Sequence, residues 1–375
     1  MHDKHWRLAT ISTVADSTQS AVGLALRTLT ERIAKRMIRR GFSQPSFVDV
    51  AMSKHRRRLW RRAIEVPADL IIAHHVPALA PATRAARILS ARLAFDAEDL
   101  HAEDRPDTPE FALDRHLISS TERRYLPLCQ RVTASAPGIA DELVRRYGIA
   151  RPAIVLNAFP NDAKIQSAPA RRPNAPLSLY WYSQVIGLDR GLQDVLRAIP
   201  LLRRPAELHL RGAVSEEVKA TLSAIAAQLG IARSLHFHPL AAPPELARLA
   251  AQHDIGLALE QPVTLNRQLC ITNKLMLYFT AGIPVVATDT PGQRAIIEAA
   301  GAAGVLYAPG DHAALAQAID TLAGSPDTLM RAKTTASELG RGLFSWERQA
   351  GKLVSYLTRD TTTAGERESA AALFA

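Results

Sequence analysis

Short apolar runs alternate with helix-forming segments along most of this chain, from about residue 69 onward. Each apolar run has the length of a buried strand, and the segments between the runs have helical periodicity. Parallel strands need crossover connections of this kind, so the alternation predicts βα units that build parallel sheets. The expected strands cover residues 69–73, 91–95, 131–134 and 153–156, and then 177–182, 207–211, 235–238, 255–259, 285–287 and 304–306.

A proline-rich stretch divides the alternation into two series. Residues 168–176 carry three prolines and no apolar period, a composition typical of a domain boundary. At 375 residues the chain also exceeds one ordinary hydrophobic core. We therefore expect an α/β domain over residues 1–168, a linker over 169–176 and a second α/β domain over 177–340. A cleft between two such domains is a preferred place for a ligand.

The segment from residue 273 to 293 is the most specific part of the second series. Its pattern predicts a short amphipathic helix, a break, the strand 285–287 and a turn that opens another helix. Gly282 can adopt the left-handed conformation that ends the first helix, and Pro284 prevents the helix from resuming. Ligands of open α/β sheets collect at the carboxyl ends of strands, so residues 288–293 are expected to offer unpaired backbone N–H groups to an anion. A phosphate-bearing ligand is the natural expectation.

Positive charge is concentrated near the N-terminus. Residues 27–62 hold twelve lysines and arginines against Glu31 and Asp49, an excess as large as the net charge of +10 of the whole chain. The cations share a helical spacing with apolar residues such as Met37 and Trp60, so these helices could lie on an anionic membrane surface. A solvated helix face packed on its own domain explains the pattern equally well. Nucleic acid is the least favoured partner, because few aromatics interleave with the arginines and no binding motif follows.

Two further observations concern the compartment. Cys129 and Cys270 stand apart and form neither a redox motif nor a metal-ligand pair, which favours a reducing environment. The chain has no apolar run of eighteen or more residues, and residues 1–6 lack the basic start and apolar core of a signal peptide. We expect a cytoplasmic protein, peripheral at the inner membrane face if the basic segment binds lipid.

Several short motifs follow one another in a fixed order. They are residues 69–74, 77–79, 95–100, 135–140, 147–148 and 155–157, and then 187–192, 273–289, 308–311 and 344–347. In order and spacing they resemble the retaining glycosyltransferases of family 4, also described as glycosyl transferases group 1. The resemblance implies the GT-B fold: two Rossmann-like parallel-sheet domains, the first on the acceptor side and the second for the nucleotide-sugar donor, with an inter-domain cleft. It also implies a helix over residues 341–359 that crosses back to the first domain, before a disordered tail over 360–375.

The resemblance implies a hexosyltransferase-like activity. A sugar would move from a nucleoside-diphosphate donor to a glycan or lipid-linked acceptor, in surface polysaccharide biosynthesis, with no metal or other cofactor. The leaving diphosphate gains negative charge in the transition state, so cations must lie near it. Arg190 suits this role as a planar fork and Lys274 as a point charge. The further donor-site candidates are Gln184, Gly187, Asn273, Thr290, Pro291, Gly292 and Gln293.

The first domain supplies the acceptor-side candidates. His74 ends the strand 69–73, where the resemblance places a catalytic histidine near the transferred sugar. A capped histidine beside His75, with its hydrogen bonds satisfied, is the alternative. The remaining acceptor-side candidates are Asp96, Glu98, Asp99, His101 and Asn157. An acidic loop of this kind is more often solvated, and its spacing is not that of a metal site.

The chain departs from the family pattern at several positions. Leu269 and Leu277 stand where family members carry two glutamates separated by seven residues, and leucine accepts no hydrogen bond from a ribose or a sugar. Glu260 is near in sequence but not at that spacing. Gln184 replaces an arginine, and the chain start lacks a glycine-rich first βα turn, with only residues 7–14 as a candidate strand. A catalytically weakened homologue that binds nucleotide sugar or glycan as a partner subunit is therefore the alternative function.

Overall fold

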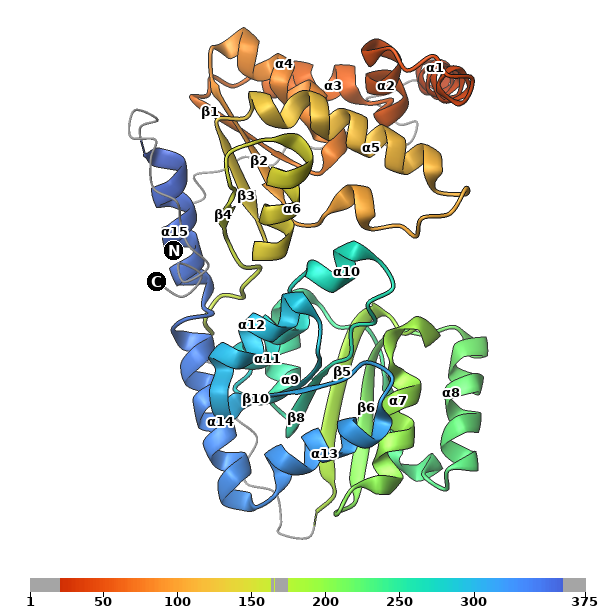
Figure 1. Ribbon diagram of the computed structural model, residues 1–375, viewed down its shortest axis with the longest axis vertical. Helices are drawn as coiled ribbons and strands as arrows, with labels where there is room; N and C mark the ends of the chain where they lie inside the picture. The colour runs from red at the N-terminus through yellow and green to blue at the C-terminus, as the bar shows by residue number, and fades with distance from the viewer. Residues whose placement is uncertain (1–20, 163–164, 166–174, 360–375) are drawn as a thin grey trace. The chain divides into compact units, whose positions relative to one another are not determined.

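The chain folds into two compact units, each with its own parallel sheet (Figure 1). The computed structural model describes residues 21–162, 165 and 175–359. Of the described residues, unit 1 contains 21–135, 139–154 and 356–359, and unit 2 contains 136–138, 155–162, 165 and 175–355. The predicted α/β class with two parallel sheets is confirmed. The candidate strand over residues 7–14, the tail 360–375 and most of the linker 169–176 lie outside the described residues.

Unit 1 has a four-stranded sheet in the order β1-β2-β3-β4. Its strands are β1 (Leu70–His74), β2 (Arg92–Ala97), β3 (Arg131–Ala134) and β4 (Ala153–Ile154), and the helices between them are α4 (Leu79–Leu89), α5 (Ala112–Tyr125) and α6 (Pro137–Tyr147). The expected strand at residues 153–156 is shorter than predicted, because the N–H of Leu156 donates to the side chain of Gln349 over 3.1 Å and not to a strand. The parallel register brings the ends of β1, β2 and β3 to one edge of the sheet.

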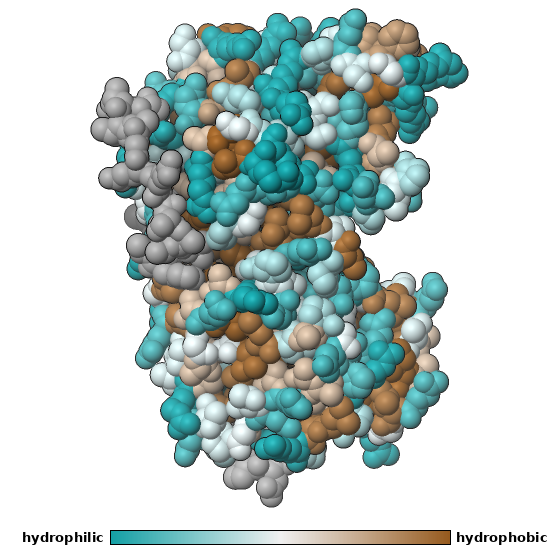
Figure 2. Space-filling view, in the orientation of Figure 1, coloured by the Kyte–Doolittle hydropathy of each residue, from teal (hydrophilic) through white to brown (hydrophobic). Residues whose placement is uncertain are grey.

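Three helices precede β1 in the described part of the chain. They are α1 (Ala21–Arg39), α2 (Pro45–Met52) and α3 (Arg56–Ala63), and they carry the basic segment. Buried residues of α1 and α2, including Ala34 and Val48, form a small core with Leu117 of α5. Figure 2 shows hydrophobic and hydrophilic side chains side by side over the region that Figure 1 draws as α1 and α2. The helical reading of the basic segment is confirmed.

Unit 2 has a six-stranded sheet in the order β10-β9-β8-β5-β6-β7. Its strands are β5 (Leu177–Val185), β6 (Ala206–Ala213), β7 (Leu235–His238), β8 (Ile255–Ala258), β9 (Val285–Thr288) and β10 (Gly304–Tyr307). Its helices are α7 (Leu192–Ala198), α8 (Glu216–Gln228), α9 (Leu246–Ala250), α10 (Leu265–Leu269), α11 (Asn273–Thr280), α12 (Pro291–Ala300), α13 (His312–Ala323), α14 (Pro326–Arg341) and α15 (Trp346–Thr358). Neither α10 nor α14 is predicted from the sequence. The strand order reverses between β5 and β8, which is where open α/β sheets bind ligands.

Alternate residues of the central strands divide the two faces of this sheet. Leu179 and Trp181 of β5 belong to the main hydrophobic core together with residues of α7 and α13. On the other face, the ring of Tyr278 from α11 lies over Gly256 of β8, where an added Cβ would come within 2.4 Å of the ring. The Tyr278 hydroxyl is 3.1 Å from the carbonyl oxygen of Leu257, to which it donates. Glycine at position 256 therefore permits the close packing that fixes α11.

Helix α14 packs closely on this framework. An added Cβ at Gly340 of α14 would lie 2.2 Å from the carbonyl oxygen of Phe279 in α11, so the two backbones are nearly in contact. In α15, residues up to Ser355 are grouped with unit 2, whereas Tyr356 onward is grouped with unit 1. None of the described helices has the length and hydrophobicity needed to cross a bilayer.

Candidate functional site

Loops of unit 2 meet at the carboxyl ends of β5 and β8. The β5 loop contains a short 3-10 helix, Leu188–Arg190, followed by Gly191. Gly191 has a φ of +71°, and an added Cβ would lie 2.9 Å from the carbonyl oxygen of Leu259. Only glycine combines this backbone conformation with so close an approach. Gly191 therefore holds the predicted donor-site residue Arg190 beside the end of β8.

A buried ion pair occupies the end of β8. Lys274 Nζ lies 2.6 Å from Glu260 Oε1, and the hydroxyl of Thr272 donates to the same oxygen over 3.1 Å. Both charged side chains are only 11% exposed. Burial alone would raise the pKa of Glu260, but Lys274, Thr272 and the more distant Arg190 together hold it below its ordinary value. Lys274 is therefore already paired within unit 2, and Glu260 is ionised at neutral pH.

Two arginines flank this pair. Arg190 is 30% exposed, and its Nε lies 3.5 Å from Asp189 Oδ1. Arg267 of α10 approaches the same carboxylate from the other side, with 3.2 Å between Nη2 and Asp189 Oδ2. Thr264 caps α10 by accepting a hydrogen bond from the N–H of Arg267 over 3.2 Å. The strand ends thus gather three cations and two carboxylates, Asp189 and Glu260.

Glu260 and Arg267 are absent from the site predicted by the sequence. Glu260 carries a usable signal, because it follows the apolar strand 255–258 and strand ends of this kind form ligand sites. Arg267 carries none, since α10 is short and has no apolar period. Leucines occupy the two positions where family members carry glutamates. Leu277 is fully buried on α11, and Leu269 is half-buried at the end of α10. Glu260 is the carboxylate that the fold brings to this helix.

The start of α12 has fewer unpaired N–H groups than the sequence predicts. The N–H of Asp289 donates to the carbonyl oxygen of Tyr307 over 2.7 Å. The N–H groups of Thr290 and Gln293 donate within the turn, and the Thr290 side chain caps the helix by accepting from the N–H of Gln293. The expectation of several unpaired donors is therefore wrong, because the sheet and the cap already use them.

Packing explains two of the predicted donor residues in this turn. An added Cβ at Gly292 would lie 2.2 Å from the carbonyl oxygen of Cys270, so glycine lets α12 approach the end of α10. Gln293 is fully buried, and its Nε2 donates to the carbonyl oxygen of Thr288 over 2.9 Å. Among the other candidates, the exposed ones are Gln184, Asn273 and Pro291, and Gly187 is half-buried in the β5 loop.

In unit 1, His74 and Asp96 meet at the strand ends. His74 Nδ1 lies 3.1 Å from Asp96 Oδ2, and the hydroxyl of Thr133 donates to Asp96 Oδ1 over 2.6 Å. His74, Asp96 and Glu98 each present one potential ligand atom, and these three atoms lie within 4.8 Å of one another. The sequence spacing does not predict this grouping, because it arises between neighbouring strands. His74 remains 57% exposed.

His75, next to this cluster, has an unusual backbone. Its φ is 61° and its ψ is 144°, a conformation that L-residues adopt rarely and at a cost of about 1–3 kcal/mol. Such strain tends to occur at functional sites. It turns the chain sharply from the end of β1 into the helical segment that leads to α4.

His101 lies beside the His74 cluster, with its ring centroid 5.9 Å from that of His75, whereas Asn157 lies elsewhere. His101 is half-buried against α5, with its Nδ1 4.0 Å from Glu122 Oε1, and burial lowers its pKa. Burial also raises the pKa of Glu122 to about 7, although Tyr147 donates to it over 2.6 Å. Asn157 is exposed beyond β4 and is grouped with unit 2. Asp99 is half-buried in the acidic loop.

The comparisons with known proteins agree with this geometry. Residues 180–325, most of unit 2, match the family model described as Glycosyl transferases group 1. The predicted resemblance to this group is confirmed. The comparison with curated proteins finds no match.

Several solved structures have a similar fold. Anabaena Alr3699/HepE, solved in complex with UDP, is 17% identical with a TM-score of 0.65, covering 84% of each chain. Sucrose-phosphate synthase from Thermosynechococcus elongatus is 15% identical with a TM-score of 0.65, covering 84% of this chain and 80% of that one. A glycosyltransferase from Rickettsia africae is 14% identical with a TM-score of 0.64, covering 91% of this chain and 96% of that one. These similarities establish the GT-B glycosyltransferase fold.

Proposed function

We propose that this protein is a retaining glycosyltransferase that moves a sugar from a nucleoside-diphosphate donor to a glycan or lipid-linked acceptor in surface polysaccharide biosynthesis. The observation that carries the proposal is the cluster of Arg190, Arg267 and the Lys274–Glu260 pair. It lies at the strand ends of the unit that matches Glycosyl transferases group 1. Preorganised cations at this place would stabilise the charge that develops on a leaving diphosphate.

The three cations have different roles in this proposal. Arg190 is partly exposed and only weakly paired, so its guanidinium can contact phosphate oxygens directly. Arg267 holds Asp189 beside Arg190 and restrains the loop. Lys274 is nearly buried, and its pairing with Glu260 fixes its position before any donor binds.

Glu260 offers a carboxylate in place of the two glutamates that this chain lacks. A carboxylate can accept hydrogen bonds from sugar or ribose hydroxyls, which Leu269 and Leu277 cannot do. Glu260 Oε1 is used by Lys274 and Thr272. We propose that Glu260 takes over part of the hydroxyl recognition from a different strand end.

On the acceptor side, we propose that His74 contacts the reacting sugar. Its Nδ1 lies against the Asp96 carboxylate, which favours the tautomer with the proton on Nδ1 and leaves Nε2 as an acceptor for a hydroxyl. The remaining predicted acceptor-side residues, Glu98 and Asp99 among them, would bind acceptor hydroxyls. We propose that neither a metal nor another cofactor takes part, so a chelator should leave turnover unchanged.

The location that we propose is the cytoplasm, at the inner membrane face. Val22, Leu26, Leu29 and Ile33 follow one another at helical spacing on α1, and each is more than half exposed. Arginines of the basic segment continue along the same helix. An exposed apolar stripe beside cations suits the interface of an anionic bilayer.

The alternative is a catalytically weakened homologue that binds nucleotide sugar or glycan as a partner subunit. Leu277, fully buried where family members carry a glutamate, favours it, as does the closed start of α12. Glu260 favours an active enzyme. The two functions differ in turnover, not in donor binding.

A panel of nucleotide sugars tests the proposal, starting with UDP sugars because the Anabaena neighbour was solved with UDP. A ligand that binds only the folded protein raises its melting temperature, so we expect one donor to do so at millimolar concentration and to be hydrolysed slowly. If no nucleotide sugar raises the melting temperature, the proposed donor site is wrong. Stabilisation without hydrolysis, and without transfer to any glycan or lipid-linked acceptor, supports the partner-subunit alternative.

A further inference from the structure

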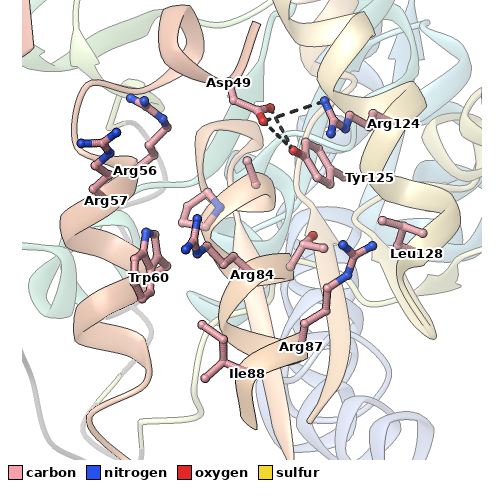
Figure 3. A pocket seen from close by; sticks show the side chains of 13 residues that line it. Asp49, Arg56, Arg57, Trp60, Arg84, Arg87, Ile88, Arg124, Tyr125 and Leu128 are labelled. Atoms are coloured by element: carbon pink, nitrogen blue, oxygen red, sulfur yellow. Dashed lines mark hydrogen bonds and ion pairs between the residues drawn. The ribbon is translucent and has the colours of Figure 1, made fainter. Parts of the chain in front are cut away.

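Unit 1 contains a pocket of about 460 Å³ that no step of the proposed function uses (Figure 3). Its walls come from α2, α3, α4 and the end of α5. Its volume is within the range of small-molecule sites. The charged side chains that line it are Asp49, Arg56, Arg57, Arg84, Arg87 and Arg124.

Most of the positive charge in this pocket is not neutralised. Five of the lining residues are arginines. In the described part of the chain, only one of them, Arg124, lies within 4 Å of a carboxylate oxygen, at 3.9 Å from Asp49 Oδ2. The Asp49 carboxylate is also engaged by the hydroxyl of Tyr125, which donates over 2.8 Å. Burial and the neighbouring Arg57 lower the pKa of Arg56, and Asp49 opposes this shift without cancelling it. A bound anion would relieve this repulsion.

The pocket also has fixed geometry. The guanidinium carbon of Arg84 lies 4.3 Å from the ring centroid of Trp60, a cation–π contact that positions its planar fork. In Figure 3, Arg84 lies beside Trp60, and Arg87 lies on the side of the pocket that holds Tyr125 and Leu128. Tyr125 is held in turn by Asp49. Trp60 thus restrains Arg84, and Tyr125 lies under Arg124, with 5.2 Å between the guanidinium carbon and the ring centroid.

The pocket is separate from the predicted acceptor residues of the same unit. His74 ends β1, which leads into the start of α4, whereas Arg84 and Arg87 lie on later turns of that helix. Each turn advances the chain by about 5.4 Å. The arginines therefore lie progressively further along α4, away from the end of β1.

We propose that this pocket binds a compact anion with at least two negative charges, a phosphate monoester or a diphosphate. Arginine forks match phosphate oxygens in bidentate geometry, and several forks around one pocket suit a group with three or more acceptor oxygens. A lipid headgroup and a free phosphorylated metabolite share this chemistry. The inference does not depend on the donor site of unit 2.

The test measures binding to the full-length protein by calorimetry, with intrinsic tryptophan fluorescence, to which Trp60 contributes, as a second readout. The probes are pyrophosphate, a short-chain phosphatidic acid below its micelle concentration, and vesicles with and without phosphatidic acid. The pocket variant is Arg84→Gln with Arg87→Gln. The control variant, Arg39→Gln with Arg40→Gln, removes the same charge at the end of α1, at exposed residues that do not line the pocket.

We expect saturable binding of pyrophosphate or of the lipid, weakened about tenfold or more in the pocket variant and nearly unchanged in the control. Arg84→Lys with Arg87→Lys keeps the charge but loses the forks, and should fall between the two. Binding of pyrophosphate identifies a soluble phosphate as sufficient, and binding of the lipid alone identifies a headgroup. Equal losses in the pocket and control variants, or no saturable binding by the wild type, would overturn the proposal.

A second variant keeps this test independent of the proposed function. Pyrophosphate could also bind near Arg190 in unit 2, so the Arg190→Ala variant is titrated in parallel. The pocket proposal predicts one binding event that is unchanged in Arg190→Ala and weakened about tenfold or more in the pocket variant. If only the Arg190→Ala variant loses binding, the pocket proposal fails and the donor site stands.

Discussion

Glu122 in unit 1 and Glu260 in unit 2 are both buried, yet their carboxyl groups behave in opposite ways. Glu122 has a side chain that is 1% exposed, accepts a hydrogen bond from Tyr147, and has its pKa raised to about 7 by burial. Glu260 is 11% exposed, and Lys274 at 2.6 Å helps to hold its pKa below the ordinary value. A cation at contact distance, and not burial, therefore decides which carboxylate is ionised at neutral pH.

The comparison extends to the cations of the two units. In unit 2, Lys274 is nearly buried and paired. In unit 1, the pocket arginines Arg84 and Arg87 are exposed, and neither lies within 4 Å of a carboxylate oxygen in the described structure. A buried charge needs a partner, whereas an exposed one is stabilised by water. The paired lysine of unit 2 suits a preorganised site, as proposed for the donor. The exposed arginines of unit 1 suit the proposed site whose charge a bound anion would neutralise.

Removing the carboxylate of Glu260 should lower the stability of the protein more than any other change considered below. Glu260→Gln leaves Lys274 buried beside a neutral side chain, and losing one partner of a buried pair costs about 3–5 kcal/mol. We expect a loss near the lower limit, because the amide oxygen still accepts a hydrogen bond. Urea unfolding followed by intrinsic tryptophan fluorescence measures it, and Trp181, whose ring centroid is 5.4 Å from Lys274 Nζ, contributes to the signal.

The double variant Glu260→Gln with Lys274→Met serves as the control for this prediction. It removes both charges, so it should lose less stability than the single variant. A single variant as stable as the wild type would show that the pair does not carry the stability assigned to it.

Glu122→Gln should have the opposite effect, and the effect should depend on pH. The folded pKa of about 7 lies above the ordinary value of 4.5, so the folded protein binds more protons than the unfolded chain between these values. Stability from this group is present at about pH 4.5 and below, and is lost as the pH rises to 7, by up to about 3 kcal/mol. The variant does not lose this stability, so its free energy of unfolding should rise relative to that of the wild type between pH 5 and 8.

Both proteins of that experiment carry the substitution His101→Gln, because His101 Nδ1 lies 4.0 Å from Glu122 Oε1 and its titration would differ between the two. Burial lowers the pKa of His101, which reduces stability as the pH falls below its ordinary value. Thermal unfolding at several pH values gives the difference between the two curves. A constant difference from pH 5 to 8 would contradict the raised pKa of Glu122.

Gly340→Ala should separate packing from charge in unit 2. The new Cβ would meet the backbone of Phe279 at 2.2 Å, and relieving such overpacking costs about 1–3 kcal/mol. Gly351→Ala is the matched control, because no atom lies within 4 Å of its Cβ and alanine favours a helix. Chemical denaturation of both variants is the measurement, and equal stabilities would show that α11 and α14 are not in close contact.

The smallest effect on stability is expected on α1. Leu26→Gln with Leu29→Gln changes only exposed side chains, so stability should stay within about 0.5 kcal/mol for each substitution. Binding to anionic vesicles should nevertheless fall clearly. Leu240→Gln, at an exposed leucine of unit 2, is the control and should leave vesicle binding unchanged. Equal vesicle binding by all three proteins would remove α1 from the proposed membrane contact.

The sequence predicts the sheets well because strand alternation is a local signal. Runs such as 255–258 and 285–288 are apolar, short and bounded by turns, and they form β8 and β9. Helices α10 and α14 escape prediction for different reasons. The former is a single short turn held by its Thr264 cap, and the latter is mostly polar and is stabilised by the close contact of Gly340 with α11.

The candidate site is less predictable because its contacts are long-range. Glu260 and Lys274 are fourteen positions apart and meet only because β8 ends beside the start of α11. Asp96 meets His74 and Thr133 across three strands. The N–H groups near Thr290 look free in a sequence pattern, but a carbonyl of β10 and the helix cap use them. Residue spacing alone carries none of this information.

Titration calorimetry of a nucleoside diphosphate tests the central claim most directly. The wild type is compared with Arg190→Ala and with the control Arg197→Ala, which removes an exposed arginine of α7 that lies 3.7 Å from Asp194. The account predicts saturable binding that weakens about tenfold or more in Arg190→Ala and is unchanged in Arg197→Ala. Equal affinity for the wild type and Arg190→Ala, or no binding to the wild type, would contradict the assignment of the donor site to the strand ends of unit 2.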